Sequence, residues 1–217
     1  MIAPAPCNLA LLDRWLTGWS RSRGLPLPRE EGGGLRVDVG WPGQLRRHVF
    51  ADAGAALQAC AAGIDLPFVH LKAAVAGEQL RAVLPAGWSF EPQGYLMACA
   101  GPMAGATSLP PGYCSTLAVE HGAWVVTILD GTGAQAATGR VTVDRGTAVF
   151  DRIDTAEPHR RRGLASAVMR ALDRLAVQAG VAERLLVATE AGASLYPALG
   201  WHHVAPWSTA VRMAPGY

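Results

Sequence analysis

The second half of the chain orders its strand and helix patterns in a way that restricts the fold. Three strand patterns, at residues 123–129, 136–144 and 147–155, are joined by Asp-Gly and Arg-Gly dipeptides, which are typical of hairpin turns. Residues 163–180 then carry apolar side chains at helical spacing, and 184–189 is a short apolar strand. Strands joined partly by hairpins and partly through a helix predict an α/β fold, with a mixed twisted sheet flanked by helices.

The first half shows weaker patterns of the same kinds. We expect helices at residues 8–23, 52–62 and 77–84, and strands at 35–40, 68–74 and between 88 and 98. Gly, Pro, Ala and Ser dominate residues 100–115, which we interpret as a linker. The predicted division is therefore an N-terminal α/β module at residues 1–114 and a second module at residues 115–217.

A short echo links the two modules. Leu-Pro-Ala-Gly-Trp at residues 84–88 resembles Tyr-Pro-Ala-Leu-Gly-Trp at residues 196–201, and each follows a strand and a helix pattern. This echo has two explanations. One is coincidence, since the chain is rich in alanine, and the other is a diverged duplication.

The composition excludes several classes of protein. With 50% hydrophobic and 17% charged residues in 217, the chain is expected to fold and not to be disordered. A net charge of +2 is too small for nucleic acid to be the main partner. We find no secretory signal, no apolar stretch that would span a membrane, no C-x-x-C pair and no His pair with metal spacing. We therefore expect a cytoplasmic protein with no metal and no membrane partner.

One run suggests an anion site. A strand pattern ends at Thr155, and a helix pattern begins near Gly163 after a short loop that contains Arg160, Arg161 and Arg162. The first backbone N–H groups of a helix have no helical partner and attract phosphate, and Gly163 and Ala165 leave the backbone accessible. The alternative is a solvated basic loop that caps the helix.

The same run resembles a family signature. Arg160-x-x-Gly163-x-Ala165 is similar to the Gln/Arg-x-x-Gly-x-Gly/Ala motif that binds acyl-coenzyme A in the GCN5-related N-acetyltransferases, the GNAT superfamily. Downstream, Leu195-Tyr196-Pro-Ala-Leu-Gly200-Trp201 resembles the family's Leu-Tyr-x-x-x-Gly-Phe. The resemblance covers residues 117–213, and the first half would be a degenerate GNAT-like module.

The resemblance implies a place for acetyl-CoA. The strand that ends at Thr155 should separate from the strand at 184–189, so that the pantetheine arm pairs with backbone groups of Ile153 and Thr155. The turn from Arg160 to Ser166 should hold the pyrophosphate. The implied cofactor-binding residues are Ile153, Asp154, Thr155, Arg160, Arg161, Arg162, Gly163, Leu164, Ala165, Ser166 and Thr189. Thr189 departs from the asparagine that the family often has at this position.

The resemblance also implies the chemistry. Tyr196 matches the family's general acid, which protonates the departing thiolate. The alternative is a helix tyrosine that packs under Trp201. The general base that deprotonates the amine is left open between Asp151 and Glu190. Asp151 lies two residues before Ile153, so it is expected on the same face of that strand.

The expected function is transfer of an acetyl group from acetyl-CoA to a primary amine of a small molecule or peptide, by direct attack in a ternary complex. We expect a monomer or homodimer. A non-catalytic acyl-CoA sensor is the alternative, and a nucleic-acid binder is opposed by the acidic residues beside the arginine run. Trp15, Trp19 and Trp41 would pack in the core or line a substrate entrance.

Overall fold

The computed structural model describes residues 7–105 and 108–214. The first half contains α1 (Leu9–Arg21), β1 (Arg29–Glu31), β2 (Gly34–Trp41), β3 (Gln44–Phe50), α2 (Ala55–Ala62), β4 (Val69–Ala73), α3 (Gly77–Val83), β5 (Trp88–Phe90) and β6 (Gly94–Cys99). The second half contains β7 (Cys114–Glu120), β8 (Ala123–Leu129), β9 (Gln135–Asp144), β10 (Thr147–Thr155), α4 (Leu164–Gln178), β11 (Glu183–Thr189), α5 (Glu190–Leu195) and β12 (His202–Arg212). Two 3-10 turns, η1 (Glu157–His159) and η2 (Tyr196–Leu199), complete it.

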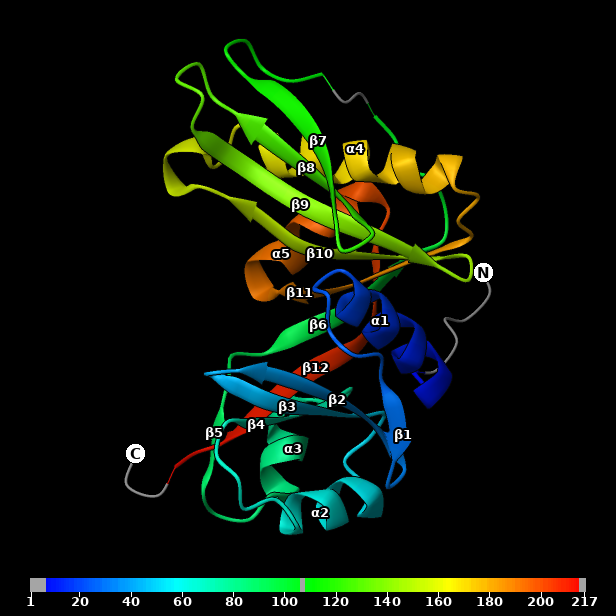
Figure 1. Cartoon of the computed structure of the whole chain (residues 1–217), viewed down its shortest axis with the longest axis vertical. Helices are drawn as coiled ribbons and strands as arrows, with labels where there is room; N and C mark the ends of the chain where they lie inside the picture. The colour runs from blue at the N-terminus through cyan, green and yellow to red at the C-terminus, as the bar shows by residue number, and fades with distance from the viewer. Residues whose placement is uncertain (1–6, 106–107, 215–217) are drawn as a thin grey trace.

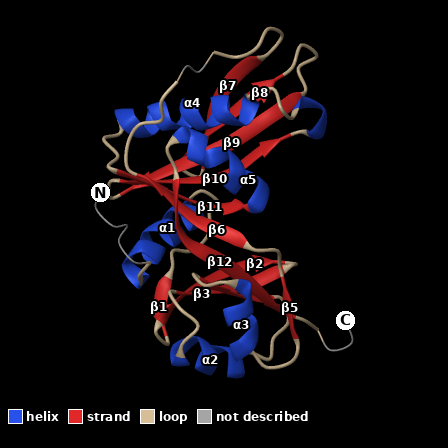
Figure 2. Cartoon of the chain, turned by 180° about the vertical axis from the view of Figure 1, so that it is seen from behind, coloured by secondary structure: helices blue, strands red, loops and turns tan. Residues whose placement is uncertain are grey.

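The strands form one mixed sheet that runs the length of the molecule (Figure 1). Its order is β1-β2-β3-β4-β12-β6-β11-β10-β9-β8-β7, and β5 pairs with β12. The pairs β3/β4 and β10/β11 are parallel, and α2 and α4 make the two connections. The sheet is twisted and flanked by helices at both ends (Figure 2). This confirms the predicted fold class.

The two halves exchange strands at the centre of the sheet. β6, from the first half, lies between β11 and β12, whereas β12, from the second half, lies between β6 and β4. At this crossing Gly94 pairs with Trp207. Each lies seven residues beyond the glycine of a Gly-Trp pair, Gly94 after Gly87 and Trp207 after Gly200. Neither half therefore has a complete sheet by itself.

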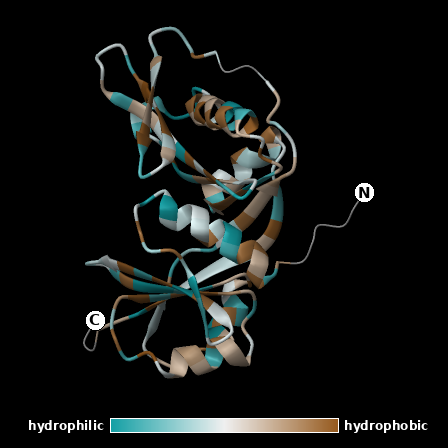
Figure 3. Cartoon of the chain, turned by 45° about the vertical axis from the view of Figure 1, so that its right-hand side comes forward, coloured by the Kyte–Doolittle hydropathy of each residue, from teal (hydrophilic) through white to brown (hydrophobic). Residues whose placement is uncertain are grey.

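Helices cover both faces of the sheet. On one face α1 contributes Trp15, Leu16 and Trp19 to a core shared with strands of both halves. On the other face α4 packs on the second half, and α2 and α3 pack on the first half. Figure 3 shows apolar and polar residues interspersed along the strands and helices.

A glycine brings α1 close to β10. A Cβ at Gly18 would overlap the side chain of Val149, so no larger residue fits at this contact. Two residues beyond α1, Arg23 pairs with Asp151 of β10 through Nε–Oδ2 and Nη2–Oδ1 bonds of 2.9 and 2.8 Å. The helix from the start of the chain is thus fixed over the strand that was expected to bind the cofactor.

Three strand expectations need correction. β3 was not expected, because Arg46, Arg47 and His48 hide its alternation, yet Arg47 and His48 are buried. β7 was placed in part within the linker, and all of its residues are exposed, including the apolar Leu117 and Val119, so it has no buried face to give an alternating pattern. Short strand patterns at 202–204 and 209–213 predict two final strands, and the structure joins them into one strand, β12, with an irregular register between His203 and Ala205.

Candidate functional site

The parallel strands β10 and β11 separate after three residue pairs. Thr147–Val149 pair with Glu183–Leu185, and beyond Val149 the strand β10 pairs only with β9. A cavity of about 710 Å³ opens beside the free ends of the two strands. The equivalent parallel pair in the first half, β3 and β4, stays paired from Arg46 to Phe50 and leaves no such gap.

Most of the predicted cofactor residues line this cavity, which we call the splay cavity. Its walls come from the end of β10, the turn before α4, the first residues of α4, and the region from β11 to η2. The predicted residues among them are Ile153, Asp154, Thr155, Arg160, Arg161, Gly163, Leu164, Ala165, Ser166, Thr189 and Tyr196. Arg162, Asp151 and Glu190 do not line it.

A β-bulge shapes the end of β10. The register with β9 shifts between Asp151 and Asp154, and Arg152 has a positive φ of 51°. Asp151 therefore faces α1, whereas Ile153 packs towards Val168 of α4. The expectation that both side chains share one face is wrong, because the bulge interrupts the alternation of the strand.

Thr155 offers an unused polar atom at the wall of the splay cavity. Its Oγ1 is buried and has no hydrogen-bond partner among the described residues. A buried hydroxyl without a partner is costly, and a ligand with polar groups in the cavity would satisfy it.

The turn before α4 is open to an anion. Gly163 precedes the helix with φ 78°, a left-handed conformation that favours glycine, and a Cβ there would meet no atom within 4 Å. No side chain caps the helix, so its first N–H groups are free to bind a ligand. Arg160 and Arg161 are exposed at the cavity and add positive charge.

A hydrogen-bonded network supports this turn from outside. Arg162 Nη1 donates to Tyr113 Oη at 3.1 Å, and Tyr113 Oη lies 2.9 Å from His159 Nδ1. His159 Nε2 is 3.4 Å from Asp130 Oδ2. Sequence reasoning missed Tyr113, because it lies in the segment read as a linker, where no pattern distinguishes it.

Tyr196 is placed to hold a proton at the other end of the splay cavity. Its side chain is 6% exposed and contacts Trp201, with the ring centroids 6.0 Å apart. Burial raises the pKa of Tyr196 to about 12, so the phenol stays protonated at neutral pH. In the described part of the chain its hydroxyl has no hydrogen-bond partner, and it is therefore free to meet a ligand. Gly192 makes room for it, since a Cβ there would lie 3.0 Å from Tyr196 Cε2.

A second cavity, which we call the α1-face cavity, adjoins the first. It measures about 580 Å³ and shares Thr189 and Ala191 with the splay cavity. Thr189 caps α5 by accepting a hydrogen bond from Gly192 N at 3.3 Å. Glu190 is exposed in the first turn of α5 and lines this second cavity.

The two candidate bases differ in their surroundings. Both oxygens of Asp151 accept hydrogen bonds from Arg23, and Oδ2 also accepts one from Ser22 Oγ at 3.3 Å. To take a proton, Asp151 would have to release part of this ion pair. Glu190 has no such competing partner among the described residues, and it stands next to the shared wall at Thr189.

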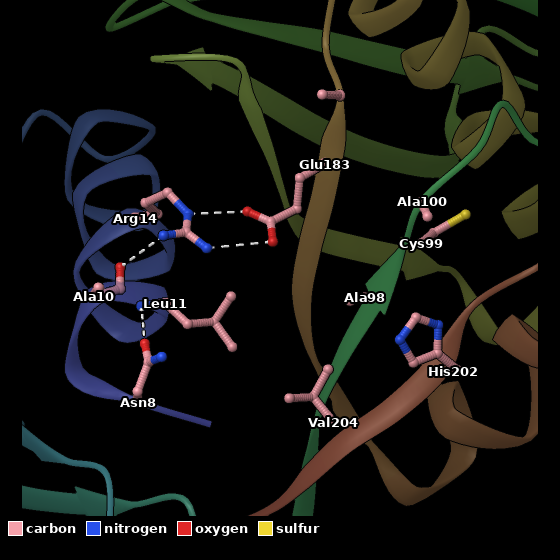
Figure 4. Close-up of a pocket in the computed structure, with 11 residues that line it drawn as sticks. Asn8, Ala10, Leu11, Arg14, Ala98, Cys99, Ala100, Glu183, His202 and Val204 are labelled. Carbon is pink, nitrogen blue, oxygen red and sulfur yellow. Dashed lines mark hydrogen bonds and ion pairs between the residues drawn. The ribbon is translucent and has the colours of Figure 1, made fainter. Parts of the chain in front are cut away.

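A third cavity lies at the opposite end of β11. Figure 4 shows Arg14 of α1 in a double contact with Glu183, near Cys99 of β6 and His202 of β12. It measures about 330 Å³, and none of the predicted site residues lines it. Glu183 and Thr189 are the two ends of β11, so about 20 Å of strand separates this cavity from the site.

The comparisons with known proteins decide the family. Residues 92–201, just over half of the chain, match the model of the Acetyltransferase (GNAT) family. The chain belongs to the GNAT acetyltransferase family. The match runs from the segment before β6 to the Gly-Trp pair after η2, so it contains every residue of the splay cavity. No curated protein matches the sequence.

Solved structures share the fold of this GNAT protein. A GCN5-related N-acetyltransferase from Kribbella flavida has a TM-score of 0.64 at 17% identity, over 96% of both chains. A GCN5-related N-acetyltransferase-like protein from Streptococcus suis has a TM-score of 0.59 at 14% identity, over 94% of this chain and 98% of that one. A tandem GNAT protein from the clavulanic acid biosynthesis pathway has a TM-score of 0.54 at 16% identity, over 65% and 63%. The match in the first two extends through both halves.

The splay cavity suits the acyl-coenzyme A that the family uses. The free N–H groups at Gly163 and the arginines fit a pyrophosphate, and the separated strands with the unpaired Thr155 hydroxyl fit a pantetheine arm. The described residues contain no group of three or more His, Cys, Asp and Glu side chains that would hold a metal ion. Among the helices described, none is long and apolar enough to cross a membrane.

Proposed function

We propose that this protein is an N-acetyltransferase that transfers an acetyl group from acetyl-CoA to a primary amine by direct attack in a ternary complex. Family membership supports acyl transfer in general. The observation that carries the finer proposal is the separation of β10 and β11 over a cavity with an anion-binding turn at one wall and a protonated tyrosine at another. Ile153, Asp154, Thr155, Thr189 and the turn 160–166 would hold the cofactor.

The chemistry follows from the side chains at the two cavities. The amine nitrogen attacks the thioester carbonyl carbon, the C–S bond breaks, and Tyr196 gives its proton to the departing sulfur. Before the attack, the ammonium form of the acceptor gives one proton to water or to a carboxylate, because only the neutral amine is nucleophilic. The nitrogen loses a second proton to solvent as the amide forms, and Tyr196 regains a proton from solvent. Glu190 is the better placed of the two candidate carboxylates, because Arg23 occupies both oxygens of Asp151.

We also propose that only the second half, residues 115–217, acts on acetyl-CoA, and that the first half, residues 1–114, is a degenerate GNAT-like module. The turn before α2 supports this, because Asp52 Oδ1 already accepts the hydrogen bond of Gly54 N at 2.7 Å. A carboxylate at this position repels phosphate, and β3 and β4 do not separate. The first half supports the second through β6, which pairs with β11, and through Arg23, which follows α1 and pairs with Asp151 of β10.

Two measurements on the wild-type protein test the function. Calorimetry should show that coenzyme A binds, and a thiol-release assay with acetyl-CoA should show turnover when a panel of primary amines is supplied. Coenzyme A binding without thiol release from any amine would support the alternative, a non-catalytic acyl-CoA sensor. Absence of coenzyme A binding would refute both readings.

A further inference from the structure

Two buried cations on the α1 face of the sheet have no part in the transfer described above. Lys72 of β4 is 7% exposed and Arg47 of β3 is 8% exposed. Both project from the face that α1 covers: Arg47 stacks 3.6 Å from the ring centroid of Trp19, and Lys72 pairs in register with Thr209 two residues from Trp207. Arg23, which pairs with Asp151 of β10, lies 4.6 Å from the centroid of the same Trp19 ring that Arg47 contacts.

Lys72 lines the α1-face cavity that adjoins the splay cavity. The cavity holds Lys72, Glu91 and Thr209 at one part of its wall and Thr189 and Glu190 at another. Because Thr189 also lines the splay cavity, a molecule in the α1-face cavity reaches the site of transfer from the side opposite to α4.

The positive charge at this wall is poorly compensated. Arg47 Nη2 donates to the neutral Gln44 Oε1 at 3.3 Å, and its Nε is buried without a hydrogen-bond partner among the described residues. Lys72 Nζ donates to Thr209 Oγ1 at 2.7 Å and is 3.7 Å from Glu91 Oε2. Glu91 is half-exposed and is also 3.7 Å from His70 Nδ1, so Lys72 and His70 share one solvated carboxylate.

Burial lowers the pKa of both side chains, because it disfavours their charged forms. Desolvation lowers the pKa of Lys72 to about 7, and the nearby charge of Arg47 contributes to this. Desolvation lowers the pKa of Arg47 to about 9, and the nearby charge of Arg23 contributes to this. Burying a cation is costly, and an anionic ligand beside Lys72 would offset part of that cost. Lys72 is also the only lysine among the 19 Lys and Arg residues of the chain. The ammonium group of lysine is smaller than the guanidinium group of arginine and has three donors that can rotate, so it leaves more room for a ligand in the cavity.

We propose that the α1-face cavity binds an acceptor that carries both an amine and a carboxylate, with the carboxylate at Lys72 and the amine near Thr189 and Glu190. This inference rests on the proposed function and names its substrate class. Arg47 stands behind Lys72 and strengthens the positive field at that wall, whereas Glu190 attracts the ammonium before it loses its proton. The opposite charges at the two parts of the wall match the two ends of a zwitterion.

The strand order also bears on the length of the acceptor. β12 and β6 lie between β4, which carries Lys72, and β11, which carries Thr189, so about 14 Å of sheet separates the two backbones. The long side chain of Lys72 covers only part of this span. The geometry favours an amine separated from its carboxylate by several bonds, such as an ω-amino carboxylate, over an α-amino group.

Matched acceptors test the inference. 6-Aminohexanoate, its neutral amide and hexylamine share one amine and one chain, and only the first carries a carboxylate. We expect kcat/KM of the wild-type protein to favour 6-aminohexanoate over hexylamine by about ten- to a hundredfold, as for a hydrogen bond between charged groups. In Lys72→Met the ratio should fall to about one, and the amide should resemble hexylamine.

Two controls separate the possible failures. Arg29→Met removes a cation whose side chain is 57% exposed, on β1, and should leave the ratio of the two acceptors unaltered. Equal use of hexylamine and 6-aminohexanoate by the wild-type protein would overturn the inference while leaving the acetyltransferase proposal intact. An unchanged preference of Lys72→Met for 6-aminohexanoate over hexylamine would also overturn the inference. Failure of the wild-type protein to bind coenzyme A in calorimetry would instead remove the proposed function.

Discussion

Replacing Tyr196 by Phe isolates proton donation from the other roles of this side chain. The ring is buried against Trp201, and the hydroxyl has no hydrogen-bond partner among the described residues. Phe keeps the ring contacts and leaves no buried group unpaired. We therefore expect the free energy of unfolding to change by less than about 0.5 kcal/mol.

The expected loss of activity follows from the position and the pKa of the phenol. A positioned general acid contributes about 10²–10⁴ to the rate. The pKa of Tyr196, about 12, lies above that of a thiol, about 8.5, so the phenol stays protonated but releases its proton less readily than a better matched acid would. This places the loss in kcat near the lower end, about 10², which corresponds to about 3 kcal/mol in activation free energy.

The assay is thiol release from acetyl-CoA with saturating amine, together with coenzyme A affinity from calorimetry. Tyr95→Phe is a matched control, because Tyr95 is a partly buried tyrosine of β6 whose ring contacts His203 outside the splay cavity. We expect kcat to fall in the Tyr196 variant alone and coenzyme A affinity to stay within about twofold in both. Full turnover in Tyr196→Phe would refute the acid role and leave this residue a packing side chain.

Three further outcomes are expected. Asp173→Asn should lower the free energy of unfolding by about 3–5 kcal/mol in chemical denaturation, because it leaves the buried Arg184 without its carboxylate, and an unaltered midpoint would contradict this. A fragment of residues 115–217 should be insoluble or expose apolar surface, because it lacks β6, the strand between β11 and β12; a monomeric fragment with a cooperative melting transition would show that the first half is an independent appendage. Between pH 7 and 10, kcat should rise as the acceptor amine loses its proton and should not fall through Tyr196, since its raised pKa keeps the acid form present; an alkaline decline that disappears in Tyr196→Phe would oppose this.

Local patterns were sufficient to predict the second half of the fold. Hairpin dipeptides, one amphipathic helix and one apolar strand predicted β8–β11 and α4 to within a few residues. Arg145 and Gly146 both have positive φ, as the tight turn between β9 and β10 requires. The residues expected to bind the cofactor are mostly contiguous in sequence, so a motif in one segment predicts a group that shares one cavity.

Features that depend on distant contacts were not predictable. β3 carries Arg46, Arg47 and His48, and only the packing of Trp19 from α1 explains why Arg47 is buried there. The exchange of β6 and β12 between the halves joins segments more than 100 residues apart, which no local period encodes. The bulge that turns Asp151 away from Ile153 likewise has no sequence signal.

The second cavity illustrates the same limit. Lys72 and Glu91 come from the first half, whereas Thr189, Glu190 and Thr209 come from the second, so the wall exists only after the halves have packed together. From the sequence, Lys72 was one basic residue in an apolar strand. Its burial and its place in the wall of the α1-face cavity became apparent only in three dimensions.

Coenzyme A binding to two glycine variants of the same helix tests the central claim most directly. Gly163 and Gly180 flank α4 at its two ends, with φ of 78° and 72°, and a Cβ at either would meet no atom within 4 Å. Substituting Glu at each position therefore imposes a similar backbone strain, but only Gly163→Glu places a negative charge and bulk at the expected pyrophosphate site. In calorimetry we expect Gly163→Glu to lose coenzyme A binding and Gly180→Glu to retain the affinity of the wild-type protein. Coenzyme A affinity that is equal in folded Gly163→Glu and Gly180→Glu would contradict the placement of the cofactor in the splay cavity.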